Sequence, residues 1–232
     1  MDIRQKRITS KSPMHIVLVA DDSTSMRGAP AAAATQAIHA WVNELYVKTR
    51  GKKPFFRFSL ISFGSVASIA AEGLDVRDVD VQAFVLDGTS GTTNLAAALA
   101  LAGELLARDG ATGAHCPPFV FLFTDGRPSD ESGRATPEVA RATFAQATLL
   151  KSMPLPCGSP VVITLGFGSA DDQLLTAIAT APALYHRLLD AHALISCLPD
   201  IGTPTVAEGD EGTVGAFVDR IMTGPAGSIR DR

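Results

Sequence analysis

Cysteine is scarce in this sequence. Three cysteines occur among 232 residues, at Cys116, Cys157 and Cys197. They are odd in number and widely spaced, and no two of them form the Cys-x-x-Cys pair that is typical of zinc and redox sites. The pattern therefore argues against zinc or redox chemistry at cysteine and predicts three reduced thiols in or near the core.

Long apolar runs and an excess of positive charge are also missing. No uninterrupted apolar stretch approaches membrane length, and the formal net charge is −4 with acidic and basic residues interspersed, so neither a membrane span nor a nucleic-acid-binding surface is predicted. The first 14 residues, MDIRQKRITSKSPM, are basic like the start of a signal peptide, but the apolar run that follows is brief and stops at Asp21. We therefore expect a cytoplasmic protein with a flexible N-terminal arm over residues 1–12.

Short β-rich runs alternate with longer stretches rich in alanine and leucine. The length suits one domain, which we place at residues 13–224, followed by a flexible tail at 225–232. The alternation predicts an α/β fold, a Rossmann-like doubly wound three-layer sandwich whose six-stranded sheet is mainly parallel and has helices on both faces. The run SVASIAA follows the second strand too closely for a helical crossover, so we expect it to be an antiparallel edge strand.

The expected elements have approximate bounds. Strands are expected at 15–20, 55–63, 65–71 and 119–124, in the segment SPVVITLG and in the segment ALYHRLL. Helices are expected at 29–48, from the segment DGTSGTTNL through residue 108, and at 137–152, 171–180, 191–199 and 212–222.

Side-chain oxygens gather where two of these strands end. Asp21 ends the first strand and Asp125 the fourth, and the segment before a middle helix supplies Ser90, Thr92 and Thr93. Because binding sites of open parallel sheets form at the carboxyl ends of the strands, we expect these oxygens to converge.

The turn after the first strand, DDSTSM, adds two hydroxyls. In such a turn Asp21, Ser23 and Ser25 can point toward one centre while Asp22 and Thr24 face elsewhere. A set made of carboxylates and hydroxyls suits a hard divalent cation, Mg²⁺ first and Mn²⁺ or Ca²⁺ next. Zinc is disfavoured because nitrogen and sulfur ligands are missing.

Enzymatic interpretations of the same residues are weaker. Ser23 lacks the Gly-x-Ser-x-Gly elbow of a serine hydrolase, and it stands where the haloacid-dehalogenase phosphatases have their second aspartate. GFGSADD lacks the third glycine and the lysine of a phosphate-binding loop, and the five histidines, His15 among them, are scattered as structural or surface residues are.

The run RPSDESGR, which follows Asp125, is either a rim that determines partner specificity or a solvated loop.

Three motifs in order carry a family resemblance. DDSTS, then GTTNL with Thr93, then FTDG with Asp125, supported by GFGSADDQLLTAIA, resemble the metal-ion-dependent adhesion site of von Willebrand factor A (vWA) domains over about residues 14–200. The compact size, the absence of extra domains and the wording of these motifs resemble most closely the bacterial TerY-like proteins of tellurite resistance.

The resemblance implies adhesion rather than turnover, so no enzymatic activity is expected. It implies Ser23, Ser25 and Thr93 as direct ligands of a Mg²⁺ ion, with Asp21 and Asp125 as water-mediated or switching ligands. A Glu or Asp of a protein partner would then complete the octahedron. The function implied is an interaction module in bacterial tellurite resistance or stress response; the alternative is a regulatory or adaptor subunit of a kinase, phosphatase or ATPase assembly.

Overall fold

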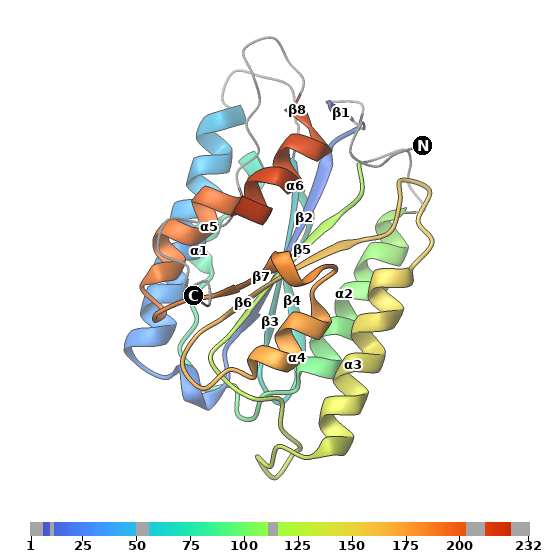
Figure 1. Ribbon diagram of the computed structural model, residues 1–232. Helices are drawn as coiled ribbons and strands as arrows, with labels where there is room; N and C mark the ends of the chain where they lie inside the picture. Colours follow the sequence, from blue (N-terminus) through green and yellow to red (C-terminus); the bar gives the residue numbers. More distant parts are fainter. Residues whose placement is uncertain (1–6, 10–11, 50–55, 111–115, 203–211, 224–232) are drawn as a thin grey trace.

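The computed structural model describes residues 7–9, 12–49, 56–110, 116–202 and 212–223. The strands are β1 (Arg7–Ile8), β2 (Met14–Asp21), β3 (Phe56–Phe63), β4 (Ala67–Asp75), β5 (Phe119–Thr124), β6 (Val161–Gly166), β7 (Tyr185–Arg187) and β8 (Gly212–Thr213). The α-helices are α1 (Ala29–Thr49), α2 (Leu95–Gly110), α3 (Pro137–Ser152), α4 (Asp172–Ile178), α5 (Ala193–Gly202) and α6 (Val214–Thr223). Figure 1 shows their arrangement along the chain.

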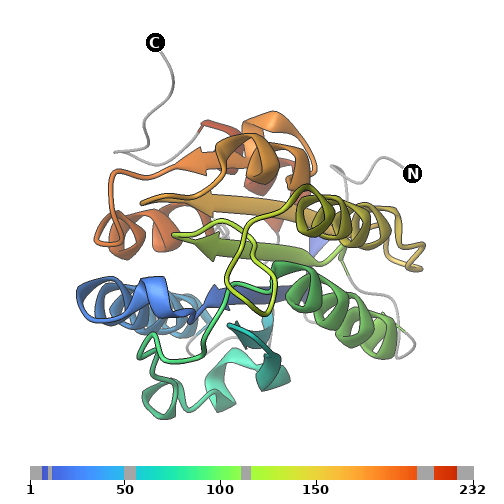
Figure 2. The same ribbon diagram turned by 90° about the horizontal axis from the view of Figure 1, so that it is seen from below.

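The main sheet has six strands in the order β4-β3-β2-β5-β6-β7. Five neighbouring strands, β3, β2, β5, β6 and β7, run parallel. Strand β4 pairs antiparallel with β3 at one edge. Figure 2 shows α1 and α5 on one side of this sheet and α2 and α3 on the other. The predicted α/β sandwich, with its mainly parallel sheet and antiparallel edge strand, is confirmed.

The central strands are apolar throughout because both faces of the sheet are covered. Every residue of β2 and of β5 is buried, as expected for parallel strands between two helical layers. Polar residues enter where these strands end, at Asp21 and Thr124, which are also buried. The sheet therefore delivers polar side chains from its interior directly to its carboxyl edge.

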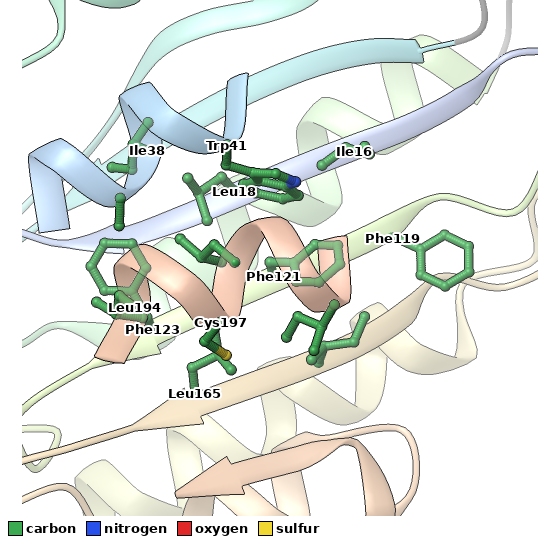
Figure 3. Packing of buried hydrophobic residues seen from close by; sticks show 14 of the residues in the cluster. Ile16, Leu18, Ile38, Trp41, Phe119, Phe121, Phe123, Leu165, Leu194 and Cys197 are labelled. Carbon is green, nitrogen blue, oxygen red and sulfur yellow. The ribbon is translucent and has the colours of Figure 1, made fainter. Parts of the chain in front are cut away.

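An aromatic cluster fixes the layer that contains α1 and α5. Trp41, from α1, is fully buried, and its ring packs edge-on against that of Phe121 with a centroid separation of 4.9 Å (Figure 3). The Trp41 ring also packs edge-on against Phe58, at 6.1 Å. On α5, a Cβ atom at Gly202 would lie 2.3 Å from the Trp41 ring. The absence of a side chain at Gly202 therefore lets α5 approach α1 closely.

Some local structure differs from the expectation. Arg7–Ile8, within the expected N-terminal arm, pair antiparallel with β8, and Ile8 is buried in the core, so this part of the arm is packed against the domain. Helix α5 continues past Pro199 to Gly202. The expected tail at 225–232 lies outside the described residues. Within the described ranges, no helix combines the length and the apolarity that a membrane crossing requires.

Candidate metal centre

Three loops meet at the carboxyl edge of the sheet. The first follows β2, the second precedes α2, and the third follows β5. Because β2 and β5 are parallel neighbours that pair as far as Ala20 and Phe123, Asp21 and Thr124 lie next to each other at this edge. The sheet register, rather than any local motif, therefore brings the first and third loops together.

The first loop is held by the carboxylate of Asp21. One oxygen, Oδ1, accepts the backbone N–H of Ser23 at 2.8 Å, and a short 3₁₀ helix, Thr24–Met26, follows. The hydroxyls of Ser23 and Ser25 lie 3.0 Å apart. Met26 is completely buried, which anchors the loop and leaves the Ser25 side chain at the surface of the site.

The other two loops bring Thr93 and Asp125 to these serines. The Ser25 hydroxyl donates to Asp125 Oδ1 at 2.6 Å. A Cβ atom built at Gly126 would lie 3.4 Å from both the Ser25 and the Thr93 hydroxyl oxygens, so both hydroxyls face this glycine. The structure thus gathers at one edge all five residues proposed from the sequence as metal ligands.

Asp22 faces away from this centre, as predicted. Its Oδ1 accepts the backbone N–H groups of Asp87 and Gly88 at 2.9 and 2.8 Å, and Oδ2 accepts the Ser90 hydroxyl at 2.6 Å. Ser90 is therefore engaged with Asp22 rather than with the candidate metal ligands. Asp22 organises the second loop, which carries Thr93.

Thr24 and Thr92 also make contacts outside the centre. The Thr24 hydroxyl donates to the Gly91 carbonyl at 2.9 Å. The Thr92 hydroxyl lies 3.0 Å from that of Ser65. These contacts tie the second loop to its neighbours, and they leave Thr93 as the hydroxyl of this loop that reaches the candidate ligands.

Two supporting residues were not anticipated. Thr124 donates its hydroxyl to Asp21 Oδ2 and accepts the Gly126 N–H at 3.1 Å, so it orients Asp21 and the third loop together. Ser129 holds Thr93 by both backbone groups: its N–H donates to the Thr93 carbonyl and its hydroxyl accepts the Thr93 N–H, each at 3.0 Å. The available signal was their position, directly before and four residues after Asp125.

Burial leaves the two carboxylates of the centre in need of positive charge. It raises the pKa of Asp21 to about 6, with a contribution from the Asp125 charge, and it also raises the pKa of Asp125. Among the described residues, no Lys, Arg or His forms an ion pair with either aspartate. Two buried carboxylates without a counter-cation, next to three hydroxyl oxygens, fit a divalent cation that prefers oxygen ligands.

The described ranges hold no cluster of three or more His, Cys, Asp or Glu side chains that suits a metal ion. The candidate centre has two carboxylates and takes the rest of its oxygens from hydroxyls. Because only two of the five ligands carry a negative charge, a bound divalent ion would retain part of its positive charge.

A Ser–His–Asp arrangement lies near the opposite end of the sheet. His15 Nδ1 is 2.8 Å from Asp109 Oδ2, and His15 Nε2 is 2.8 Å from the Ser59 hydroxyl. Ser59 is fully buried and its hydroxyl accepts the Gly73 N–H at 2.7 Å, while Arg57 pairs with Asp109. Ser59 is too deeply buried to meet a substrate. These contacts instead hold β2, β3 and α2 together, and His15 is structural, as expected.

The comparisons with known proteins agree with this architecture. The family model described as von Willebrand factor type A domain matches residues 15–197. No curated protein sequence matches the chain.

Several solved structures share the fold at low sequence identity. The vWF domain of the pilus tip protein Mfa5 from Porphyromonas gingivalis has a TM-score of 0.63 at 13% identity, covering 96% of this chain and 99% of that one. The pilus adhesin SpaC from Lactobacillus rhamnosus GG, in its open conformation, has a TM-score of 0.65 at 19% identity. The match covers 79% of this chain and 29% of that one.

Proximal thread matrix protein 1 from the mussel byssus, in a structure with a zinc-occupied metal-ion-dependent adhesion site, has a TM-score of 0.60 at 20% identity, covering 82% of this chain and 46% of that one. The chain therefore spans less than half of SpaC and of the mussel protein. The match to the family model over residues 15–197, on a sheet of this order and direction, shows that the chain belongs to the von Willebrand factor type A domain family.

Proposed function

We propose that this protein is a non-catalytic, metal-dependent interaction module that binds an acidic side chain of a partner protein. The ion is held by Asp21, Ser23, Ser25, Thr93 and Asp125. One observation carries the proposal: two buried carboxylates, with no cationic partner among the described side chains, face three hydroxyls at the carboxyl edge of the sheet.

The residues have distinct roles in this proposal. Ser23, Ser25 and Thr93 offer neutral oxygens to the ion, and Asp125 offers a carboxylate that is already hydrogen-bonded to Ser25. Asp21 acts through a water or as a switching ligand, since both its oxygens are engaged, by Ser23 and by Thr124. A ligand set with so few carboxylates leaves the ion able to accept a Glu or Asp from outside.

Mg²⁺ is the ion we propose, because it requires near-octahedral oxygen coordination and keeps positions open for exchange. Mn²⁺ and Ca²⁺ fit the same oxygen set. The mussel protein with a zinc-occupied site shows that zinc belongs among the ions to be tested, although the nitrogen and sulfur ligands that zinc favours are missing from this set.

Thermal melting tests the metal. Adding Mg²⁺ at a hundredfold excess over its dissociation constant is expected to stabilise the folded state by about 2.7 kcal/mol. Mn²⁺, Ca²⁺ and Zn²⁺ are run in parallel, and EDTA should reverse each effect. Asp125→Ala should abolish the shift, whereas Asp130→Ala, which removes a carboxylate of the same loop that is paired with Arg134, should retain it. Identical melting curves with every ion and with EDTA would contradict the proposal.

Ser129 provides a test of how the site is built. Ser129→Ala should leave the Thr93 N–H without its side-chain acceptor, with a stability cost of about 1 kcal/mol, and should weaken Mg²⁺ binding about tenfold because Thr93 is no longer fixed. Ser132→Ala is the matched control, because the Ser132 hydroxyl donates a hydrogen bond to Asp130 in the same loop rather than to Thr93. Equal metal affinity of the two variants would show that Ser129 has no positioning role.

The finer biological assignment is also a proposal. We place the module in the bacterial cytoplasm, among TerY-like proteins of tellurite resistance or stress response. This assignment is based on the resemblance of its motif sequences and its size to those proteins. Affinity purification from the native cell, in Mg²⁺ and in EDTA with Asp21→Ala as control, identifies the partner. Recovery of a kinase, phosphatase or ATPase in Mg²⁺ alone would favour the adaptor role, and a yield that neither EDTA nor Asp21→Ala changes would contradict metal-dependent adhesion.

A further inference from the structure

Two arginines beside the candidate metal centre have no partner in the described part of the chain. Arg27 lies two residues after Ser25, and Arg127 lies two residues after Asp125. Both are exposed, and the side chain of neither makes a hydrogen bond or an ion pair with the residues that the structure describes.

The other lysine and arginine side chains that the structure describes are engaged. Arginine–carboxylate pairs join Arg57 to Asp109, Arg77 to Asp75, Arg108 to Glu72, Arg134 to Asp130, Arg141 to Glu138 and Arg187 to Asp172. Lys48 pairs with Glu44, Lys151 donates to two backbone carbonyls, and Arg220 also has an interaction. Among the arginines whose side chains the structure describes, the unengaged ones are therefore the two that flank the site.

The backbone fixes the positions of both arginines. Arg127 follows Gly126, which faces the Ser25 and Thr93 hydroxyls, and it begins the loop that Ser129 ties to Thr93. The N–H of Arg27 donates to the Thr24 carbonyl at 3.3 Å. These contacts hold the backbone of both arginines in the loops that carry the candidate ligands, so both side chains start from the rim of the site.

Charge on the rim follows from this arrangement. Three of the five candidate ligands are neutral hydroxyls, so a bound divalent ion keeps part of its positive charge, on a chain whose formal charge is −4. The exposed carboxylate of Asp87 accepts the N–H and the hydroxyl of Thr89, and the partly buried carboxylate of Asp130 is paired with Arg134. Arg27 and Arg127 are therefore a local source of positive charge around the ion.

We propose that Arg27 and Arg127 select a partner segment that carries several acidic residues in succession. One carboxylate reaches the ion, and neighbouring carboxylates pair with the two guanidinium groups, whose forked donors match carboxylate geometry. This inference rests on the proposed function and adds to it the class of segment that is bound.

Two fluorescent peptides test the inference on the full chain by fluorescence anisotropy in millimolar Mg²⁺. One carries Glu-Asp-Glu in a Gly/Ser background, and the other carries a single Glu in the same background. The wild-type protein should bind the first more tightly. Arg27→Glu/Arg127→Glu should weaken that binding at least about tenfold, with a smaller difference at high salt.

The controls separate this inference from the proposed function. Arg77→Glu/Arg108→Glu carries the same charge change away from the rim and should bind like wild type. Arg27→Gln/Arg127→Gln should lose about threefold, which keeps the test valid where charge reversal disturbs folding. Each variant should retain the Mg²⁺-dependent melting shift.

Each outcome is decisive. Unchanged affinity of both rim variants for the acidic peptide, with Mg²⁺ dependence intact, overturns the inference and leaves the proposed function standing. Binding that depends on the arginines but is indifferent to EDTA overturns the proposed function and retains the role of Arg27 and Arg127 in binding an acidic segment. Failure of wild type to bind either peptide overturns both.

Discussion

Asp21→Asn is expected to make the metal-free protein more stable at neutral pH and to abolish its response to Mg²⁺. The Asp21 carboxylate is fully buried and has no cationic partner among the described residues. Asparagine has the same shape: its carbonyl oxygen can keep the Ser23 N–H, and its amide can donate to the Thr124 hydroxyl oxygen. The substitution therefore removes a buried charge without removing the contacts that hold the loop.

The size of this effect follows from the pKa of Asp21. Burial raises it from 3.8 to about 6 in the folded state, so between these values the folded protein binds more protons than the unfolded chain. The free energy of unfolding therefore falls as pH rises through this window, and about 3 kcal/mol is lost above it. Asp125, whose pKa is also raised, acts in the same direction, so the comparison of wild type with Asp21→Asn isolates Asp21.

Melting in EDTA at pH 5 and pH 7.5 checks this prediction. Wild type should lose stability between the two pH values, and Asp21→Asn should lose much less. Asp22→Asn is the matched control, because the Asp22 carboxylate accepts three hydrogen bonds and its loss should destabilise by about 1 kcal/mol. A variant Asp21→Asn that is less stable than wild type at pH 7.5 in EDTA, or that still responds to Mg²⁺, would refute the argument.

Gly64→Ala is expected to damage both the fold and the metal centre, although residue 64 contributes no ligand. A Cβ atom at Gly64 would lie 2.1 Å from the backbone oxygen of Ser90. Two hydrogen bonds join the turn after β3 to the segment before α2. The Ser65 N–H donates to the Ser90 carbonyl at 2.7 Å, and the Asn94 N–H donates to the Gly64 carbonyl at 2.8 Å. Thr93 lies within the segment that these bonds hold, so it must move when the backbone shifts.

We expect Gly64→Ala to cost about 1–3 kcal/mol of stability and to weaken Mg²⁺ binding at least about tenfold. Denaturant unfolding and metal titration measure the two effects. Gly103→Ala is the control: its Cβ would meet the flexible end of Met153 at 3.4 Å, and alanine is favoured within a helix by roughly 0.5–1 kcal/mol. Wild-type metal affinity in Gly64→Ala would show that the β3–β4 turn does not position Thr93.

The strands and the order of the main elements could be predicted because they depend on local pattern. The run FVFLFT is apolar along its whole length, as a strand covered on both faces must be, and β5 has the predicted bounds, Phe119–Thr124. Helix α3 also has the predicted bounds, Pro137–Ser152, since Thr136 caps its start and proline is favoured in the first turn.

Contacts between distant segments limited the remaining predictions. The pairing of β1 with β8 joins residues about 200 positions apart, and no local periodicity signals a two-residue strand. Helix α5 passes Pro199 because its continuation packs against Trp41, a contact that outweighs the hydrogen bond lost at proline.

The candidate ligands could be proposed because Asp21 and Asp125 end buried strands at one edge of the sheet, and because the three motifs in order resemble the vWA adhesion site. The supports of these residues could not. Thr124 and Ser129 act through geometry: one becomes a partner of Asp21 when β5 pairs with β2, and the other becomes a partner of Thr93 when the third loop folds over the second. The same holds for the side chains of Arg27 and Arg127, which have no partner among the described residues because of where the described carboxylates lie in the folded structure.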